Sequence, residues 1–465
     1  MLYNNIMKKI TQKNKIKIRV FETFSGIGAQ HKALDILESL GYLEYKIVAT
    51  SEWDIWANIS YNAIHNKGMN IASKLTDEKI NSFLLKFTHS SDSKTPLTQN
   101  QVLKLSRNVR ENLYSSLILS NNLGSISEIK GKNLFEQAGV VDLLTYSFPC
   151  QDLSTAGSFH GKNQGMKKNS GTRSGLLWEI ERILNELKQI NELPKYLLLE
   201  NVNNMLSERH KKEYIKWISF LKKIGYNTQT YVLEANNYGC PQNRKRVFAL
   251  SVRKDISKSF KDTYFESNKQ KIKEFNAPLD ISKEVNINLK LDSIIKNNYN
   301  IEKYRNEAIK ATPNDTPSRR RMYSNNRLLS FEKDPTEQKH LKAKYYKKGE
   351  LKYSQFTSTI TTKQDRDPNS GSIDLKGTIL ENMYNETKCI DKSNYRFLTP
   401  RECFLLMGFK ENDYESIIKN TKNIVNNKGK KIISETILYR QAGNSISVNV
   451  LVSIFNKILE IEKSR

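Results

Sequence analysis

The sequence predicts an α/β fold in which a mostly parallel, doubly wound sheet is followed by a second, smaller domain. Three observations carry this prediction. The chain opens with a strand, a glycine turn, a helix and a second strand, which is the βαβ order of a parallel sheet. Buried-strand and amphipathic-helix patterns then alternate up to about residue 254. Beyond residue 254, Lys, Asn, Ser and Thr dominate and apolar periodicity is weak.

The opening unit is indicated by the spacing of its apolar side chains. Apolar and basic residues alternate over 16–21, which predicts a strand. A glycine turn follows at 25–28. Apolar residues at helical spacing over 33–40 then predict a helix that Gly41 ends. A second strand over 45–51 leads to Glu52.

The later elements are predicted in the same way. The polar stretch of about 66–120 reads as an inserted, mostly helical segment. We then expect strands over 140–147, 196–199, 229–233 and 247–252, helices around 176–187, before Gly225 and over about 448–458. These elements divide the chain into a catalytic domain over 15–254, a second domain over 255–395, and a segment over 396–465 that returns to the first domain.

Composition restricts the class of protein. The formal net charge of +26 favours a polyanionic partner, of which nucleic acid is the commonest, although lysine-rich composition can also reflect an AT-rich genome. The four cysteines form no CxxC pair, so we expect neither a zinc site nor a disulfide framework. The polar start and the lack of a long apolar run predict a soluble, cytoplasmic protein without a membrane segment.

The first candidate site is the glycine turn together with the end of the second strand. Phe24, Ser25, Gly26, Ile27 and Gly28 lie between a strand and a helix, where glycines let a ligand approach the backbone and the helix amides. His31 replaces the third glycine of a dinucleotide site. At the next strand end, Glu52 could hold both ribose hydroxyls of an adenosine, and Trp53 could lie against adenine. Alone, this pattern is a weak signal.

Two further candidates lie at strand ends. Pro149 and Cys150 directly follow a buried strand, which can present a cysteine as a nucleophile, although most single cysteines are inert and buried. Glu200 follows the next strand and could hydrogen-bond a ligand or simply cap a helix. Arg244 and Arg246 project to one side of an extended chain and could grip a base or a phosphate together, unless the turn is only a solvated basic one.

Taken in order, these motifs resemble those of the DNA (cytosine-5) methyltransferases. In the first half of the chain, the resemblance rests on Phe24, Gly26 and Gly28, on Glu52-Trp53, on Pro149-Cys150-Gln151 and on Glu200-Asn201-Val202. In the second half, it rests on residues 242–246, 401–403 and 407–409, and on residues 441–445, which include Asn444 and Ser445. It covers nearly the whole chain except the insertion and the second domain.

The resemblance implies a Rossmann-like domain that uses S-adenosylmethionine and methylates C5 of a cytosine flipped out of double-stranded DNA. Cys150 would be the nucleophile, assisted by Glu200, Arg244 and Arg246. The cofactor would contact the glycine turn, Glu52, Trp53, Ser125, Ile126, Pro149, Asn444 and Ser445. Ser125 stands where the family usually has Asp, which is a departure.

The second domain would read the DNA sequence. Thr359-Ile360 is the candidate for the family's Thr-aliphatic recognition pair, although it could equally be an ordinary strand. The basic run Arg319, Arg320 and Arg321 and, in the catalytic loop, Gln151 and Ser154 are the other expected DNA contacts. We expect a monomer, with a role beside a cognate restriction endonuclease or as a solitary methylase.

Two other functions remain compatible with the sequence. A tRNA cytosine-5 methyltransferase would carry the same catalytic series, but the long stretch between Val252 and Tyr395 favours a sequence-reading DNA enzyme. A catalytically inactive DNA-binding protein would not need Cys150, Glu200 and Arg246 together.

Overall fold

The computed structural model describes residues 15–150, 153, 165, 166, 168, 173–262, 289–324, 330–333, 335, 336, 339–347, 350–387 and 391–465. Gln151 and Ser154, which the sequence analysis gives as expected DNA contacts, lie outside the described residues. None of the described helices is both long and apolar enough to cross a membrane.

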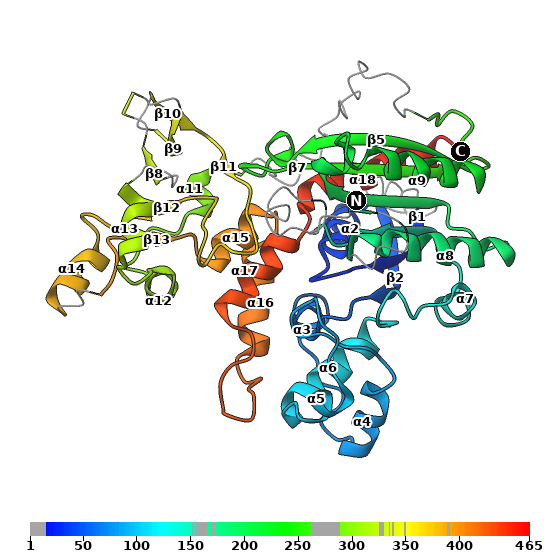
Figure 1. The fold of residues 1–465 in the computed structure, drawn as a ribbon, viewed down its shortest axis with the longest axis horizontal. Helices are drawn as coiled ribbons and strands as arrows, with labels where there is room; N and C mark the ends of the chain where they lie inside the picture. Colours follow the sequence, from blue (N-terminus) through cyan, green and yellow to red (C-terminus); the bar gives the residue numbers. More distant parts are fainter. Residues whose placement is uncertain are drawn as a thin grey trace, which may run out of the picture.

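A six-stranded sheet forms the centre of the molecule (Figure 1). Its order is β2 (Leu43–Ser51), β1 (Ile16–Thr23), β3 (Leu143–Tyr146), β4 (Tyr196–Val202), β7 (Lys245–Arg253) and β5 (Tyr226–Glu234). The strands β2, β1, β3 and β4 pair in parallel, whereas β7 is antiparallel to both of its neighbours. The predicted mostly parallel sheet is therefore confirmed.

Helices cover both faces of this sheet, because successive strand residues point to opposite sides. In β4, Leu198 belongs to the core shared with α2 (Ala29–Ser39) and α18 (Val448–Lys463), whereas Leu197 and Leu199 belong to the core on the other face. That second core is completed by α7 (Gly131–Ala138), α8 (Leu177–Gln189) and α9 (Lys211–Lys223). The doubly wound arrangement follows from this alternation.

The predicted bounds of several strands are wrong, and those of three strands affect the site. The strand predicted for 140–147 is only four residues long, from Leu143 to Tyr146. The strand predicted to stop at Leu199 continues to Val202, because Glu200 pairs with Phe248 and Val202 with Arg246 across β7. For the same reason β7 begins at Lys245, before the predicted start at Val247. Glu200 and Arg246 are therefore strand residues, held in a fixed register.

The inserted segment is helical, as predicted. It follows α3 (Ile55–His65) and contains α4 (Asp77–Leu84), α5 (Gln99–Leu103) and α6 (Arg107–Leu119), which bury a small core of their own. The chain returns to the central sheet where the Leu123 amide donates to the Thr50 carbonyl oxygen at 2.9 Å. The insertion is thus anchored to the end of β2.

The region after residue 289 contains a second sheet. Its order is β10 (Glu350–Ser354), β9 (Leu341–Lys347), β8 (Ser330–Lys333), β12 (Ser372–Asp374) and β13 (Tyr395–Phe397). The helices beside it are α11 (Leu291–Ile294), α12 (Glu302–Ala311), α13 (Pro317–Ser324) and α14 (Ile379–Glu386). The short strand β11 (Thr357–Ser358) pairs with β6 (Gln242–Asn243) of the catalytic half. The division at 254 and 395 stays a prediction, and β13 crosses its second boundary.

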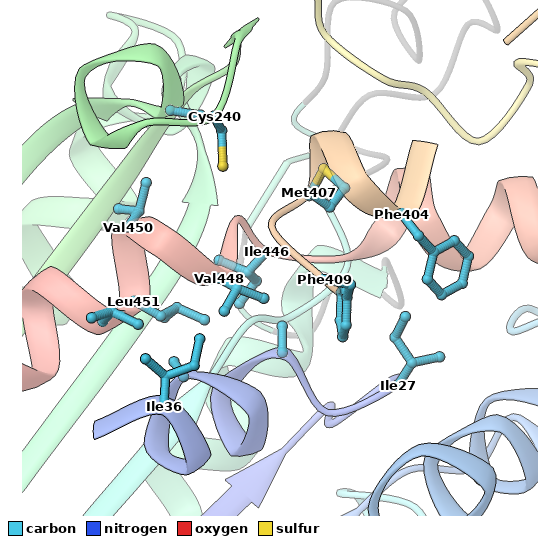
Figure 2. Close-up of a cluster of buried hydrophobic side chains, with 14 of the residues drawn as sticks. Ile27, Ile36, Cys240, Phe404, Met407, Phe409, Ile446, Val448, Val450 and Leu451 are labelled. Atoms are coloured by element: carbon cyan, nitrogen blue, oxygen red, sulfur yellow. The ribbon is translucent and has the colours of Figure 1, made fainter. Parts of the chain in front are cut away.

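The C-terminal segment passes between the two halves of the molecule (Figure 1). It contains α15 (Pro400–Leu406), α16 (Glu411–Thr421), α17 (Glu435–Asn444) and α18. Figure 2 shows Ile446, Val448 and Leu451 packed among Ile36 of α2 and Met407 at the end of α15. The short 3-10 turns Arg173–Leu176, Asn203–Leu206 and Ala235–Tyr238 complete the described elements.

Buried ion pairs join this segment to the second region. The Arg396 guanidinium is completely buried and donates to both carboxylate oxygens of Glu402, at 2.8 and 2.9 Å. Glu402 also accepts the Thr399 and Lys296 amides, at 2.7 Å each. One ion pair therefore caps α15 and holds the residues after α11.

Replacing Arg396 with methionine should lower the free energy of unfolding by about 3–5 kcal/mol, because it leaves the Glu402 carboxylate buried without its counter-charge. Urea denaturation followed by circular dichroism measures this. Arg320→Met is the matched control, because its ion pair with Asp315 is exposed on the arginine side and should contribute less than about 1 kcal/mol. Equal effects of the two substitutions would contradict the account.

Candidate active site

A cavity of about 380 Å³ opens where β1, β2, β3 and β4 end. This is where parallel α/β sheets place their ligands, because the loops after adjacent strands diverge there. The predicted site residues that line it are Phe24, Ser25, Gly26, Ile27, Glu52, Trp53, Ser125, Ile126, Pro149, Cys150, Glu200, Arg244, Arg246, Asn444 and Ser445. The cavity thus collects residues from four strand ends and from the turn between α17 and α18.

Glu52 is held at one end of the cavity by backbone amides. The Gly26 amide donates to its Oε2 at 3.0 Å, and the Asp54 amide donates to its Oε1 at 2.8 Å. Burial, and next the charge of Asp54, raise the pKa of Glu52 to about 7, although the amides act in the opposite direction. The carboxylate is therefore fixed between the glycine turn and the start of α3.

The glycine turn needs its positive φ angles. Phe24, Gly26 and Gly28 have φ values of 52°, 54° and 81°. Gly28 does not line the cavity but packs underneath the turn, where a Cβ atom would lie 2.3 Å from Nε2 of His65. The same His65 nitrogen lies 3.1 Å from the Ile27 carbonyl oxygen. His65 therefore supports the turn from below.

A buried polar network continues from this point. The Tyr61 hydroxyl donates to the buried Glu22 carboxylate and lies 2.7 Å from Nδ1 of His31. The rings of His31 and His65 are stacked, with centroids 3.9 Å apart and planes 8° from parallel. Among the described residues, only His31, His65 and Asp35 bring three possible metal-ligand atoms close together. A single ion cannot lie in the planes of two stacked parallel rings, so this geometry does not fit a chelate.

Cys150 lies in the turn after β3. The turn is fixed by neighbouring side chains, because Asn201 Nδ2 donates to the Phe148 carbonyl oxygen at 3.1 Å and Ser174 Oγ donates to the Pro149 carbonyl oxygen at 2.7 Å. Burial raises the pKa of the Cys150 thiol, the nearby Arg246 charge lowers it and Glu200 raises it. Burial and Glu200 therefore favour the thiol over the thiolate, and Arg246 opposes them.

Glu200 and Arg246 lie on one face of the sheet beside Cys150. Because Arg246 pairs with Val202, it is a diagonal neighbour of Glu200. Its Nε atom lies 3.5 Å from Glu200 Oε1. Burial raises the pKa of Glu200, whereas Arg246 lowers it. The pair is a partly desolvated carboxylate and cation that face the cavity.

Arg244 has a different environment. Its guanidinium is buried and donates to the carbonyl oxygens of Ile360 at 3.1 Å, Gly443 at 3.1 Å and Ser445 at 2.7 Å. The expectation that Arg244 and Arg246 act together on one base does not fit these bonds. Arg244 instead connects three chain segments around the cavity.

The remaining predicted residues have mixed placements. Ser125 lines the cavity, and its side chain hydrogen-bonds that of Ser127. In the chain, Ser125 lies after the segment that bridges to β2 and well before β3 begins. Ile360 is 1% exposed, which does not fit the predicted contact of its side chain with DNA. Thr359 Oγ1 donates to the Asn243 carbonyl oxygen, at 2.5 Å. Arg319 lies against the Phe397 ring, while Arg320 and Arg321 are exposed on α13.

Sequence reasoning missed several residues that line the cavity, among them Asp54, Ser93 and Arg440. Asp54 caps α3 by accepting the Trp56 and Ala57 amides. Its position one residue after Trp53, before an apolar helix, is an ordinary cap signal that could have been read. Nothing in the sequence places Ser93 or Arg440 beside it, because they come from the insertion and from α17.

The fold and the cavity define an α/β protein in which a cysteine and a glutamate from neighbouring strand ends share one cavity. Comparison with known proteins is more specific. The sequence model of the family described as C-5 cytosine-specific DNA methylase matches residues 108–460. The chain belongs to this family and is a DNA cytosine-5 methyltransferase.

Curated relatives match along nearly the whole chain. The orphan methyltransferase M.SssI of Spiroplasma monobiae is 33% identical over 464 residues, which cover 97% of this chain and 100% of the relative. The type II methyltransferase M2.ScrFI of Lactococcus lactis subsp. cremoris is 30% identical over 449 residues, covering 95% and 99%. Both names describe methyltransferases of bacterial type II or orphan systems, and neither supports an inactive DNA-binding protein.

Solved structures share the fold. The S. pombe Dnmt2 methyltransferase has a TM-score of 0.51 and 17% identity, over 96% of this chain and 98% of that one. The Entamoeba histolytica methyltransferase EhMeth has a TM-score of 0.52 and 14% identity, over 96% and 99%. At these identities the likeness concerns the fold alone.

Gly28→Ala should lower the free energy of unfolding by about 2–4 kcal/mol, because it adds a collision with His65 to the strain of a positive φ. Gly26→Ala is the matched control. It has a positive φ but open space around the added Cβ atom, so only the strain of about 1–2 kcal/mol should appear. Chemical denaturation of both variants measures the difference. If Gly26→Ala lowers the free energy of unfolding as much as Gly28→Ala does, His65 does not pack under the turn as described.

Proposed function

We propose that this methyltransferase transfers the methyl group of S-adenosylmethionine to C5 of a flipped-out cytosine through a transient covalent bond between Cys150 and C6. The observation that carries the proposal is that Cys150, Glu200 and Arg246 line the same cavity as the glycine turn and Glu52. A nucleophile, an acid and a nucleoside-binding carboxylate thus share one continuous space.

The cofactor end of the cavity fits a nucleoside with a sulfonium group. The family uses S-adenosylmethionine as its methyl donor, and that group would supply an electrophilic methyl at the cavity. Glu52 offers a carboxylate to ribose hydroxyls, Trp53 offers an apolar ring, and the turn over 24–28 offers backbone amides. Ser125 and Asn444 add polar groups to the lining.

The cytosine end of the cavity fits activation of a ring carbon. C5 of cytosine is too weakly nucleophilic to accept a methyl group unaided. Once a base has taken the thiol proton, addition of the Cys150 sulfur to C6 places electron density on C5 and makes it enamine-like. C5 would then form the bond to the methyl group as the bond from that methyl to its sulfonium sulfur breaks. A base removes the C5 proton, and the C5–H electron pair restores the C5–C6 double bond as the Cys150 sulfur leaves C6 with its own bonding pair.

Glu200 and Arg246 stabilise the charges of this step. Glu200, with its raised pKa, can hold a proton toward N3 of the ring and accept a hydrogen bond from the amino group. Arg246 can donate to O2 and lowers the pKa of the Cys150 thiol. Arg244 acts as a positioning residue, because its donors are directed at backbone carbonyls.

The second region would select the DNA sequence. Its chemistry suits a polyanion, since the chain carries a net charge of +26 and α13 exposes Arg320 and Arg321. We propose Thr359, Arg319, Gln151 and Ser154 as further DNA contacts, a monomeric enzyme, and a cytoplasmic place of action. A cognate endonuclease would recognise the same site without touching this chain.

The covalent step can be trapped. On a target duplex with 5-fluorocytosine, fluorine cannot leave C5 as a cation, so the enzyme should stay attached to DNA after methyl transfer. Denaturing electrophoresis of the labelled duplex should show the adduct. Cys150→Ala should abolish both the adduct and methylation while DNA binding is retained.

Cys240→Ala is the matched control, because Cys240 is buried next to Ser447, away from the cavity lining. It should form the adduct like the wild type. The proposal fails if the wild type gives no adduct on DNA that it methylates, or if Cys150→Ala still methylates.

A further inference from the structure

The insertion reaches the cavity through one loop, residues 90–95. The Ser90 amide donates to the Trp53 carbonyl oxygen at 2.8 Å, and the Ile55 amide donates to the Ser90 carbonyl oxygen at 2.9 Å. The loop therefore runs along residues 53–55, immediately after Glu52. A segment that does not belong to the central sheet thus forms part of the cavity wall beside Trp53.

The Asp92 side chain holds the loop together through hydrogen bonds within it. The Asp92 Oδ1 atom accepts the Lys94 and Thr95 amides, at 2.7 and 2.8 Å, and the Ser90 hydroxyl at 3.0 Å. These bonds lower the pKa of Asp92 to about 2 against the opposing effect of desolvation. In this loop Ser93 adopts φ 61°, a left-handed conformation that is strained for a serine.

The strained serine is directed at Asp54. Ser93 Oγ donates to Asp54 Oδ2, and the Arg440 guanidinium donates to the same oxygen at 2.8 Å. Arg440 also donates to the Ser91 carbonyl oxygen at 3.3 Å. The Asp54 side chain is 4% exposed, so this carboxylate is almost fully desolvated. Three separate segments, namely the insertion, the start of α3 and α17, therefore meet at one carboxylate.

Asp54 transmits this contact to the cofactor end of the cavity. Its other oxygen, Oδ1, caps α3, and its backbone amide donates to Glu52 Oε1. A displacement of Asp54 would move both the donor that orients Glu52 and the backbone that carries Trp53. Ser93, Asp54 and Arg440 also line the cavity themselves.

We propose that the 90–95 loop of the insertion is part of the cofactor site, and that Ser93 and Arg440 are positioning residues that set the affinity for S-adenosylmethionine through Asp54 and Glu52. This rests on the proposed function. It assigns a role to the insertion, since deletion of the loop would remove the Ser93 hydroxyl from Asp54 and the Ser91 carbonyl oxygen from Arg440.

The test is calorimetric titration of S-adenosylmethionine into the full-length wild type, Ser93→Ala and Arg440→Met. Ser93→Ala removes only the hydroxyl and keeps the Cβ atom. It should raise the dissociation constant about tenfold, as expected for a lost hydrogen bond to a charged group. Arg440→Met should raise it more, and Arg440→Lys, which keeps the charge, should restore part of the loss. In steady state, KM for the cofactor should rise while kcat and KM for DNA stay unchanged.

Ser82→Ala is the matched control. Ser82 is an exposed serine of the same insertion whose hydroxyl donates only within α4, so its loss should not change the affinity. If the wild type binds the cofactor and Ser93→Ala and Arg440→Met bind it equally tightly, the inference is overturned while the proposed function stands. It is also overturned if the loss of cofactor affinity in each variant is fully accounted for by a lower unfolding temperature. If the wild type itself does not bind the cofactor, the proposed function fails, and this inference with it.

Discussion

The buried guanidinium of Arg244 is the constraint on which the site depends. From the connection between β6 and β7, it reaches Ile360 of the second region and Gly443 and Ser445 at the turn between α17 and α18. Burial lowers its pKa to about 9, which still leaves it charged at neutral pH. Carbonyl oxygens from two segments that are distant in sequence therefore accept hydrogen bonds from one cation, and part of the cavity wall forms where these segments meet the segment that carries Arg244.

The chemistry then follows from strand register. The antiparallel pairing of β4 with β7 makes Glu200 and Arg246 diagonal neighbours, and the parallel pairing of β3 with β4 brings the turn of Cys150 beside them. Close backbone approach completes the wall, because a Cβ atom at Gly443 would lie 2.4 Å from the Thr362 amide nitrogen. The hydrogen-bonded pairing of these strands thus aligns side chains that are far apart along the chain.

The sequence was sufficient for the sheet, the helices around it and many of the residues that line the cavity, because apolar periodicity and glycine turns report local geometry directly. It could not show that β4 and β7 extend through Glu200 and Arg246, since their extension depends on mutual pairing. The different environments of Arg244 and Arg246 were equally hidden, because two residues of the same type at alternate positions look equivalent until tertiary partners are known. The meeting of Ser93, Asp54 and Arg440 depends on contacts between remote segments, for which the chain carries no local signal.

Amide hydrogen exchange of Arg244→Lys and Arg246→Lys tests the central claim most directly. A lysine at position 244 keeps the charge but cannot reach three carbonyl oxygens in the planar arrangement of a guanidinium. The amides of Ile360 and Ser445 should then exchange at least about tenfold faster than in the wild type, because local opening costs less free energy. Arg246→Lys should leave their exchange unchanged. Unchanged protection in Arg244→Lys, or equal loss in both variants, would contradict the account.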